Sequence, residues 1–210
     1  MTNRILRKTS NTCLAVIREK QVKKTRGELV FAADRRISWG MSHCQIGVRP
    51  KVVKRNGVIL AGTGTSYLCD LICELTPIQD IGKYEDGFSY VHNVLHPNIK
   101  RTIVDKGYGD KDGNLSLPED MGAVILVGVQ HELFELAVEG NYLSIDAINA
   151  PYAHGCGGHY ALGSLKTTEN LKISSEERLS LAIGVAAELS PGCDNRMDII
   201  RESDDDTSSN

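Results

Sequence analysis

The sequence predicts an α+β fold in which two β-sheets are covered by helices. Three observations lead to this prediction: strand-like runs fill the first third of the chain, two helical patterns follow, and a second group of strands precedes two more helices and a closing strand. Strands and helices grouped in this way favour an α+β arrangement over regular alternation. No segment repeats at a fixed period, which excludes a solenoid.

The first four strand-like runs come in two pairs. Residues 12–18 and 28–34 are apolar and flank a long basic tip, which is typical of a strand pair joined by a hairpin. The third and fourth runs, residues 51–53 and 58–61, flank Asn56-Gly57, and this dipeptide is a strong hairpin signal.

Two helices are predicted next. Apolar residues at helical spacing indicate a helix over residues 66–75, and Pro77 ends it. A second apolar pattern covers residues 88–104, with an interruption or kink expected around Pro97. A loop rich in Gly and Asp then extends to Pro118.

The second half of the chain begins with a buried strand over residues 122–129. Further strand-like runs lie on either side of the turn at residues 139–141, and the second of them extends through Ile148. A glycine turn at residues 155–158 starts a helix, residues 176–188 form an amphipathic helix, and residues 197–200 form a short strand.

The ends of the chain differ from this middle part. Residues 1–11 are polar and basic and show no periodicity, so we expect a leader or propeptide. Residues 202–210 are acidic and polar, so we expect a disordered tail. The predicted organisation is therefore a leader over 1–11, one domain over 12–201 and a tail over 202–210.

Composition narrows the function classes. The 210 residues suffice for one sizeable core, and a net charge of -3 argues against a nucleic-acid-binding surface. No apolar run reaches the length of a membrane span or of a signal sequence, so we expect a cytoplasmic protein. The six cysteines are expected to be reduced thiols. Cys156-x-x-His159 and His43-Cys44 lack finger-like spacing, so we predict no metal site and no cofactor.

Four residues supply the parts for amide hydrolysis. Thr12 stands at the mouth of the first strand, Asp34 ends an otherwise apolar run, Lys51 opens a strand, and Gly62 lies in a glycine-lined turn. A threonine is activated as a nucleophile when its own freed amine acts as the base. Taken alone, Thr12 would be a β-branched residue at a strand start, and the ordered set favours the catalytic interpretation. The six histidines have no Asp or Ser partner at a recognisable spacing, so none is assigned a role.

The ordered motifs from Thr12 to about Ile200 resemble those of the proteasome β subunits and, more closely, their bacterial counterpart, the HslV peptidase. The matching segments are Thr12-Cys13-Leu14-Ala15-Val16, Ala32-Ala33-Asp34 followed by Gly40, Lys51-Val52-Val53, Ala61-Gly62, and Gly155-Cys156-Gly157-Gly158-His159-Tyr160-Ala161. The resemblance implies a four-layer αββα sandwich of the N-terminal-nucleophile hydrolases.

The resemblance also implies roles for residues. Thr12 would be the nucleophile once residues 1–11 are removed, Lys51 would lower the pKa of its oxygen, and Asp34 would hold Lys51 protonated. The Gly62 N–H would donate to the oxyanion. Cys156 replaces the serine that supports the family's nucleophile, and Asp194 is the candidate for the family's late carboxylate. The residue before the scissile bond, commonly glycine in the family, is Asn11.

The leading hypothesis is a threonine-type endopeptidase that acts on proteins or peptides within a homo-oligomeric ring. The resemblance implies an ATP-dependent unfoldase as a possible partner, whereas the composition predicts neither nucleic acid nor a membrane as a partner. Two alternatives stay open. One is a non-catalytic ring scaffold, and the other is a small-amide hydrolase in which Cys13 is the nucleophile after cleavage one residue later.

Overall fold

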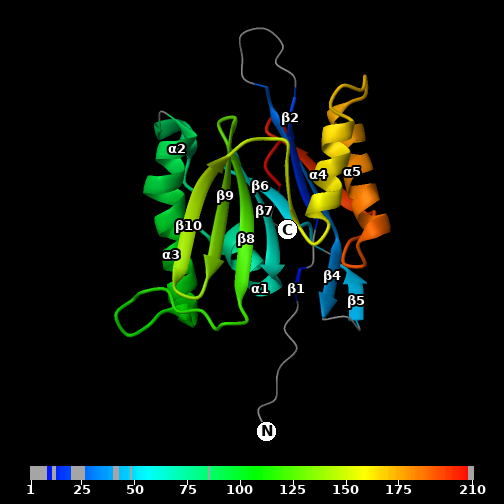
Figure 1. The fold of residues 1–210 in the computed structure, drawn as a ribbon. Helices are drawn as coiled ribbons and strands as arrows, with labels where there is room; N and C mark the ends of the chain where they lie inside the picture. Colours follow the sequence, from blue (N-terminus) through cyan, green and yellow to red (C-terminus); the bar gives the residue numbers. More distant parts are fainter. Residues whose placement is uncertain are drawn as a thin grey trace.

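The computed structural model describes residues 9–10, 13–19, 27–39, 43–47, 49–84 and 86–207. In these residues, two β-sheets are stacked face to face, with helices on the outer face of each (Figure 1). The predicted α+β class and the αββα order of layers are confirmed. Three apolar clusters fill the spaces between the four layers. The helices that are described include none that is long and apolar enough to cross a membrane.

The larger sheet, sheet A, has the strand order β10-β9-β8-β7-β1-β4-β5, and β6 also pairs with β7. The Asn-Gly hairpin predicted between β6 and β7 is present, with positive φ at Asn56 (47°) and at Gly57 (77°). The strands are β1 (Thr9–Ser10), β4 (Arg36–Trp39), β5 (His43–Ile46), β6 (Val52–Arg55), β7 (Val58–Thr65), β8 (Gly122–Val129), β9 (Glu132–Glu139) and β10 (Tyr142–Ile148).

Strand β1 comes from the predicted leader and lies inside sheet A. Thr9 pairs with Ser38 of β4 and with Thr65 of β7, and Ser10 pairs with Gly64 of β7. Both pairings are antiparallel. The sequence showed no strand pattern here, because two polar residues carry no alternation and their pairing partners lie far along the chain.

The smaller sheet, sheet B, has the strand order β11-β2-β3-β12. Its strands are β2 (Cys13–Arg18), β3 (Leu29–Asp34), β11 (Tyr152–Gly155) and β12 (Met197–Arg201). Alternate residues of β2 divide between two cores: Leu14 and Val16 face sheet A, whereas Cys13, Ala15 and Ile17 pack toward the outer helices. Because both faces are buried, β2 and β3 appear in the sequence as continuous apolar runs.

The helices cover the two outer faces. Sheet A is covered by α1 (Ser66–Asp70), η1 (Leu71–Leu75), α2 (Gly87–Tyr90), η3 (Val91–Leu95), α3 (His96–Ile103) and η4 (Val104–Tyr108), with a short turn η2 (Ile81–Lys83). Pro97 lies in the first turn of α3, directly after the π-helical turn η3. Sheet B is covered by α4 (Gly158–Thr167) and α5 (Ser175–Leu189), and Ser174 with Glu177 forms a capping box at the start of α5.

The acidic tail differs from its prediction over residues 202–207, which are held against the body of the protein. Lys54 Nζ donates to the carbonyl oxygens of Glu202 and Asp204, and Lys54 N donates to Thr207 Oγ1 at 3.0 Å. Asp206 accepts from the amides of the β6–β7 turn. Residues 202–207 are therefore ordered, despite a composition typical of disorder, because they bind a lysine and turn amides that lie far away in the sequence.

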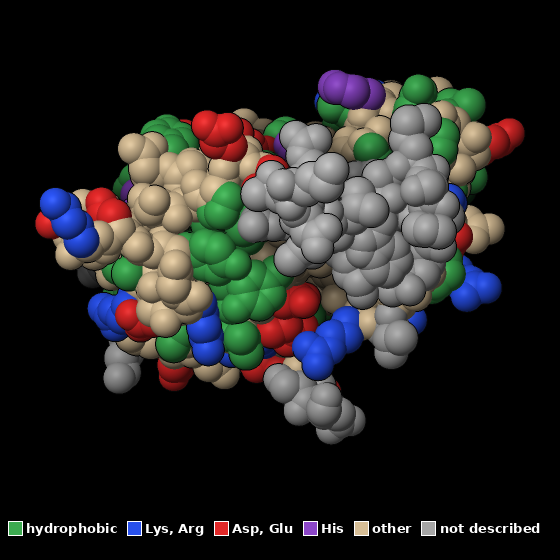
Figure 2. Space-filling view, turned by 90° about the horizontal axis from the view of Figure 1, so that it is seen from below, with side chains coloured by type: hydrophobic (Ala, Val, Ile, Leu, Met, Phe, Trp, Pro, Cys, Tyr) green, Lys and Arg blue, Asp and Glu red, His purple; other side chains and the backbone are tan. Residues whose placement is uncertain are grey.

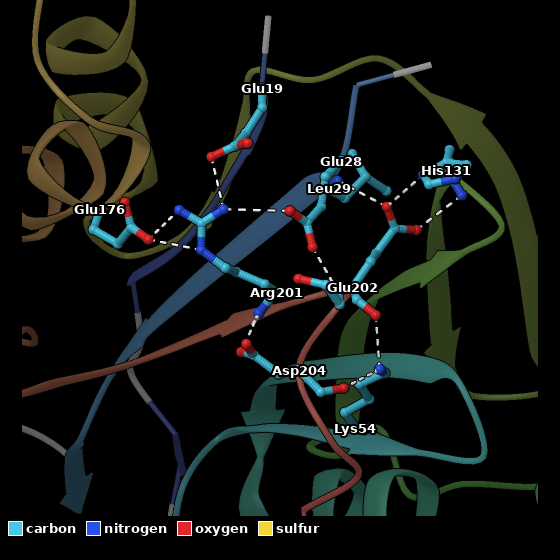
Figure 3. Close-up of polar contacts among 10 residues, drawn as sticks. Glu19, Glu28, Leu29, Lys54, His131, Glu176, Arg201, Glu202 and Asp204 are labelled. Atoms are coloured by element: carbon cyan, nitrogen blue, oxygen red, sulfur yellow. Dashed lines mark hydrogen bonds and ion pairs between the residues drawn. The ribbon is translucent and has the colours of Figure 1, made fainter. Parts of the chain in front are cut away.

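Arg201 lies at the base of this tail and is surrounded by acidic side chains (Figure 3). Its guanidinium donates to Glu176 from α5, to Glu19 at 2.7 Å and to Glu28 at 3.3 Å. We call Glu19, Glu28, Glu176 and Arg201 the Arg201 cluster. Next to it, Glu202 accepts from Leu29 N at 2.8 Å and from His131 N at 2.8 Å. The cluster joins sheet B, α5 and the tail.

Candidate active site

Asp34, the last residue of β3, is completely buried and accepts four hydrogen bonds. Its Oδ1 accepts from Cys13 N at 3.0 Å and from Lys51 Nζ at 3.1 Å. Its Oδ2 accepts from Asp194 N at 2.9 Å and from Arg36 N at 3.2 Å. A buried carboxylate needs donors on both oxygens, and these four come from four separate segments of the chain.

Lys51 lies directly before β6 and reaches Asp34 across the gap between the sheets. Its side chain is 8% exposed, and Nζ also donates to the carbonyl oxygen of Arg36. The structure thus pairs Lys51 with Asp34, as the resemblance implied. The ammonium is held by two acceptors in a place with little access to water.

The electrostatics of this pair are governed by burial. Burial is the largest influence on Asp34 and raises the pKa of its carboxyl, because desolvation disfavours the charged form. Burial likewise lowers the pKa of Lys51 below its ordinary value. The attraction between the two charges opposes both shifts. A pair of groups with pKa values moved toward each other is typical of functional sites.

Thr12, the predicted nucleophile, and Gly40 lie outside the described residues. The nitrogen that donates to Asp34 at 3.0 Å belongs to Cys13, which is the residue covalently bonded to Thr12. Residue 12 is therefore joined directly to an atom that contacts the Asp34–Lys51 pair.

Gly62 lies in β7, and its N–H donates to the carbonyl oxygen of Lys51 at 3.0 Å. A Cβ at this position would lie 3.0 Å from Cys69 Cβ and 3.1 Å from the side chain of Ile125, so the position has little room for a side chain. The amide predicted as an oxyanion donor is already engaged in strand pairing. Its catalytic role stays a prediction and requires the N–H to turn or to be shared.

Asp194 reaches the site through its backbone. Its amide donates to Asp34, whereas its carboxylate Oδ1 accepts from Arg196 N at 2.8 Å in the loop before β12. Cys156, in the glycine turn before α4, is exposed, and its Sγ lies 3.4 Å from Cys193 Sγ. Asp194 thus contacts Asp34 through its amide, and Cys156 lies next to Cys193, the residue that precedes Asp194 in the sequence.

Three groups at this site were missed in the sequence. Arg36 supplies an amide to Asp34 and a carbonyl to Lys51, and its Nη1 donates to Cys193 O at 3.2 Å. Cys193 was not singled out. His154 was left without a role, and it pairs in register with Leu14, directly beside the Gly155–Cys13 pair. Backbone contacts such as those of Arg36 leave no pattern of residue types that would reveal them.

A cavity of about 300 Å³ opens beside this region. Its walls come from the ends of β7, β8 and β9 in sheet A and from β11 in sheet B. His154 lines this cavity, and its Nδ1 is buried and has no hydrogen-bond partner among the described residues. The lining residues are Thr63, Gly64, Gly122, Ala123, Val124, Ala137, Val138, Glu139 and His154.

Neither the known protein families nor the curated protein sequences contain a match to this chain. Several solved structures are similar to it. BPH from Thiobacillus denitrificans in complex with epoxomicin has a TM-score of 0.64 and 17% identity, covering 90% of this chain and 97% of that one. Eukaryotic HslV from Trypanosoma brucei has a TM-score of 0.59 and 16% identity, covering 90% of this chain and 98% of that one.

A third similar structure is a Gly-1 mutant of Anbu from Hyphomicrobium sp. strain MC1. Its TM-score is 0.61 and its identity is 13%, covering 94% of this chain and 85% of that one. Similarity at such low identity extends to the fold. The resemblance to HslV inferred from the motifs is confirmed at that level, and this chain has the fold of the proteasome-type N-terminal-nucleophile hydrolases.

Proposed function

We propose that this chain is a threonine-type endopeptidase whose nucleophile is Thr12, exposed by removal of residues 1–11. One observation carries the proposal. A fully buried Asp34 pairs with Lys51 and also accepts from the amide of Cys13, the residue bonded to Thr12. Burial of an ion pair costs desolvation energy. Because this pair also contacts the residue next to Thr12, and because perturbed pKa values are typical of functional sites, the pair favours a catalytic role.

In this mechanism, the freed α-amine of Thr12 takes the proton from the threonine hydroxyl. Such an amine has a pKa of about 7.7–8.0 in model peptides, which suits a general base near neutral pH. The hydroxyl oxygen then attacks the peptide carbonyl, and the Lys51 ammonium favours the negative charge that develops nearby. Asp34 keeps that ammonium in place and supports its charge.

The position of β1 supports a peptide substrate. Strand β1 lies between β7 and β4, where Thr9 pairs with both strands and Ser10 pairs with β7. Without the leader, these two strands would offer free N–H and C=O groups to an extended chain, which is recognition by strand addition. We infer that the substrate takes the place that the leader occupies before removal.

The cavity beside His154 suits one side chain of such a substrate. Thr63 and Gly64 line the cavity, and Gly64 also pairs with the leader strand at Ser10. A buried imidazole nitrogen without a partner favours a polar side chain that can complete its hydrogen bond. We infer a preference for a polar residue in the substrate at this position.

The alternatives make different demands on the structure. A Cys13 nucleophile would need an accessible thiol, whereas Cys13 is 0% exposed and packs in the core between sheet B and the outer helices. A scaffold would have no use for a buried Asp34–Lys51 pair. The homo-oligomeric ring, the ATP-dependent unfoldase, the removal of residues 1–11 and the cytoplasmic location belong to the proposal as well.

The intact mass of the active protein tests this proposal most directly. We expect loss of residues 1–11, and loss of residues 1–12 would instead assign the nucleophile to Cys13. Thr12→Ala should retain the leader and show no turnover of a fluorogenic peptide, whereas the matched change Cys13→Ala should be processed and active. Turnover by a chain that still begins at Met1 would refute the proposal. Epoxomicin, which is bound in the BPH structure, offers a second readout through inhibition of the wild type.

A further inference from the structure

Three thiols gather around Gly157 on the side of sheet B that faces α4 and α5. Cys156 Sγ lies 3.4 Å from Cys193 Sγ, and Cys193 also forms a side-chain hydrogen bond with Cys13. A Cβ at Gly157 would lie 2.6 Å from Cys193 Sγ and 3.0 Å from Cys13 Cβ. The absence of a side chain at Gly157 is therefore what allows the thiols to approach.

The two closest thiols differ in their access to solvent. Cys156 is exposed, whereas Cys193 is 1% exposed. An exposed thiol beside a sheltered one is the usual arrangement of a thiol that meets an oxidant and a thiol that resolves the product. The proposed peptidase reaction assigns no role to this pairing.

We propose that Cys156 and Cys193 form a redox-active dithiol, which a hydroperoxide oxidises to a disulfide. A disulfide bond is about 2.05 Å long, so the two sulfur atoms must approach each other by roughly 1.4 Å from their present separation. Cys156 lies in the turn between β11 and α4, and Cys193 lies in the loop between α5 and β12. Both cysteines are outside helices and strands, so side-chain rotation with a small loop shift can close this gap.

The chemistry balances with one peroxide for two thiols. The Cys156 thiolate attacks one peroxide oxygen, the O–O bond breaks, and water leaves once the second oxygen takes a proton. The product is a sulfenic acid on Cys156. Cys193 sulfur then attacks the sulfenic sulfur, and the hydroxyl departs as a second water. In sum, two thiols and one hydrogen peroxide give one disulfide and two waters.

The disulfide would act on the candidate active site through the Cys193 loop. The carbonyl of Cys193 accepts from Arg36 Nη1 at 3.2 Å, and the next residue, Asp194, donates its amide to Asp34 at 2.9 Å. A negative charge on either thiol also raises the pKa of Lys51. Movement of Cys193 toward Cys156 therefore disturbs the donors that hold Asp34. The expected effect on turnover rests on the proposed function, whereas the thiol chemistry does not.

The environment sets the speed of oxidation. The hydrogen bond with Cys193 is the largest influence on Cys156 and raises the pKa of its thiol, with a further contribution from burial. The pKa of Cys193 is raised to about 12, chiefly by its hydrogen bond with Cys13. Because the thiolate is the reactive form, oxidation should be slow at neutral pH and should rise about tenfold per pH unit through the mildly alkaline range.

Thiol mapping tests the site on the whole purified chain. The reduced protein is treated with hydrogen peroxide at pH 7, 8 and 9, free thiols are alkylated, and the digest is analysed by mass spectrometry. We expect a Cys156–Cys193 cross-linked peptide that forms faster at higher pH and disappears with dithiothreitol. Cys73→Ala, which alters a buried thiol on η1, should keep the cross-link, and Cys193→Ala should lose it. Should Cys193→Ala fail to fold, Cys156→Ser replaces it in the same comparison.

A cross-link between Cys13 and Cys193, or separate alkylation of Cys156 and Cys193 after peroxide treatment, would overturn the dithiol. Turnover measured in parallel addresses the coupling. We expect at least a tenfold loss on oxidation of the wild type, recovery with dithiothreitol, and no loss in Cys193→Ala. Full turnover by the cross-linked protein would overturn the coupling. Absence of turnover in the reduced wild type would count against the proposed peptidase, and the mapping would still decide the dithiol.

Discussion

The Asp34–Lys51 pair and the Arg201 cluster join opposite charges in different surroundings. In the pair, the side chains are 0% and 8% exposed, and backbone amides supply most of the donors to the carboxylate. In the cluster, Arg201 is 24% exposed and its acidic partners are 21% to 40% exposed. The hydrogen bond from Arg201 is the largest influence on Glu176 and lowers the pKa of its carboxyl, whereas burial raises the pKa of Asp34.

The pKa shifts of Glu176 and Asp34 have opposite directions, and this difference distinguishes two roles of charged residues in the protein. In the Arg201 cluster, the partners favour the ionised forms, and the contacts join β12, α5 and the tail without a large desolvation cost. In the pair, the fold holds two charges where solvation disfavours them, and it compensates with four donors to one carboxylate. A stabilising network tolerates water, whereas a catalytic pair gains strength from its exclusion. Changes in the two regions should therefore affect different measurements.

The largest effect is expected from Lys51→Ala. Loss of an electrostatic group at a reacting centre commonly costs about 2.7–4 kcal/mol, so turnover should fall by about a hundredfold to a thousandfold. Lys51→Arg should not restore it, because a planar guanidinium cannot replace a compact ammonium. Lys54→Ala is the matched control, since Lys54 lies on β6, the strand that Lys51 precedes, and binds tail carbonyls. The measurement is the turnover of a fluorogenic peptide by the folded variants. A rate for Lys51→Ala near that of Lys54→Ala would contradict a catalytic role for Lys51.

The pH profile should sharpen the contrast. If the Thr12 amine must be neutral and Lys51 charged, turnover rises through about pH 7.7–8.0 and falls at alkaline pH. That alkaline limb should lie below 10.5, because burial lowers the pKa of Lys51 from this ordinary value. Asp34→Asn removes the charge that raises the pKa of Lys51, so the alkaline limb of the residual activity should move to lower pH.

The control for this pH shift is Asp198→Asn, which removes the partly buried partner of Arg35 and should leave the alkaline limb in place. An unmoved limb in Asp34→Asn would mean that another group titrates there.

A smaller effect, on stability alone, is expected from Arg201→Met. Its partners are partly exposed, so we expect a loss of about 1–2 kcal/mol in the free energy of unfolding, measured by urea denaturation. The turnover of the folded fraction should be unchanged. Arg35→Met, which breaks the partly exposed ion pair with Asp198, should cost less than about 1 kcal/mol. A loss of turnover in fully folded Arg201→Met would mean that the Arg201 cluster contributes to activity, which would contradict the distinction between the two regions.

The smallest effect is expected from His154→Leu, which changes only the cavity beside the pair. The variant should retain turnover within about threefold on its best substrate, and its preference should move from polar to apolar side chains at one position, by about threefold to tenfold. A peptide library varied one position at a time measures the ratio. An unchanged preference at every position would exclude His154 from substrate selection.

Much of the fold could be predicted from local pattern. The strands β2, β3 and β8 are apolar on both faces, and the Asn56-Gly57 turn has a characteristic pair of residues, so each left a signal in the sequence. The strands β1, β4, β5 and β11 have two to four residues each and were not anticipated. Strands β1 and β11 pair only with partners distant in the chain, and β4 and β5 pair with each other and join sheet A through β1, so local periodicity does not record them.

The residues of the candidate site likewise divide into those with a local signal in the sequence and those without one. Asp34 could be identified because a charge at the end of an apolar run is unusual, and Lys51 could be identified from its place among the ordered motifs. Their remaining partners were hidden, since the Asp194 amide and the Arg36 carbonyl are backbone groups that every residue type carries. The approach of Cys156 to Cys193 depends on the α5–β12 loop, which the sequence did not place.

The two residues of β1 also affect how readily molecules of this protein associate with one another. Among the described strands, β4 and β5 are linked to the rest of sheet A through β1 alone. A chain that begins after residue 11 would carry two unpaired sheet edges facing each other, and open edges of this kind promote association between molecules. Strand β1 therefore closes the sheet. If residues 1–11 are removed as proposed, cleavage is best delayed until other surfaces enclose the gap, so the place of two residues in sheet A orders folding, enclosure and cleavage.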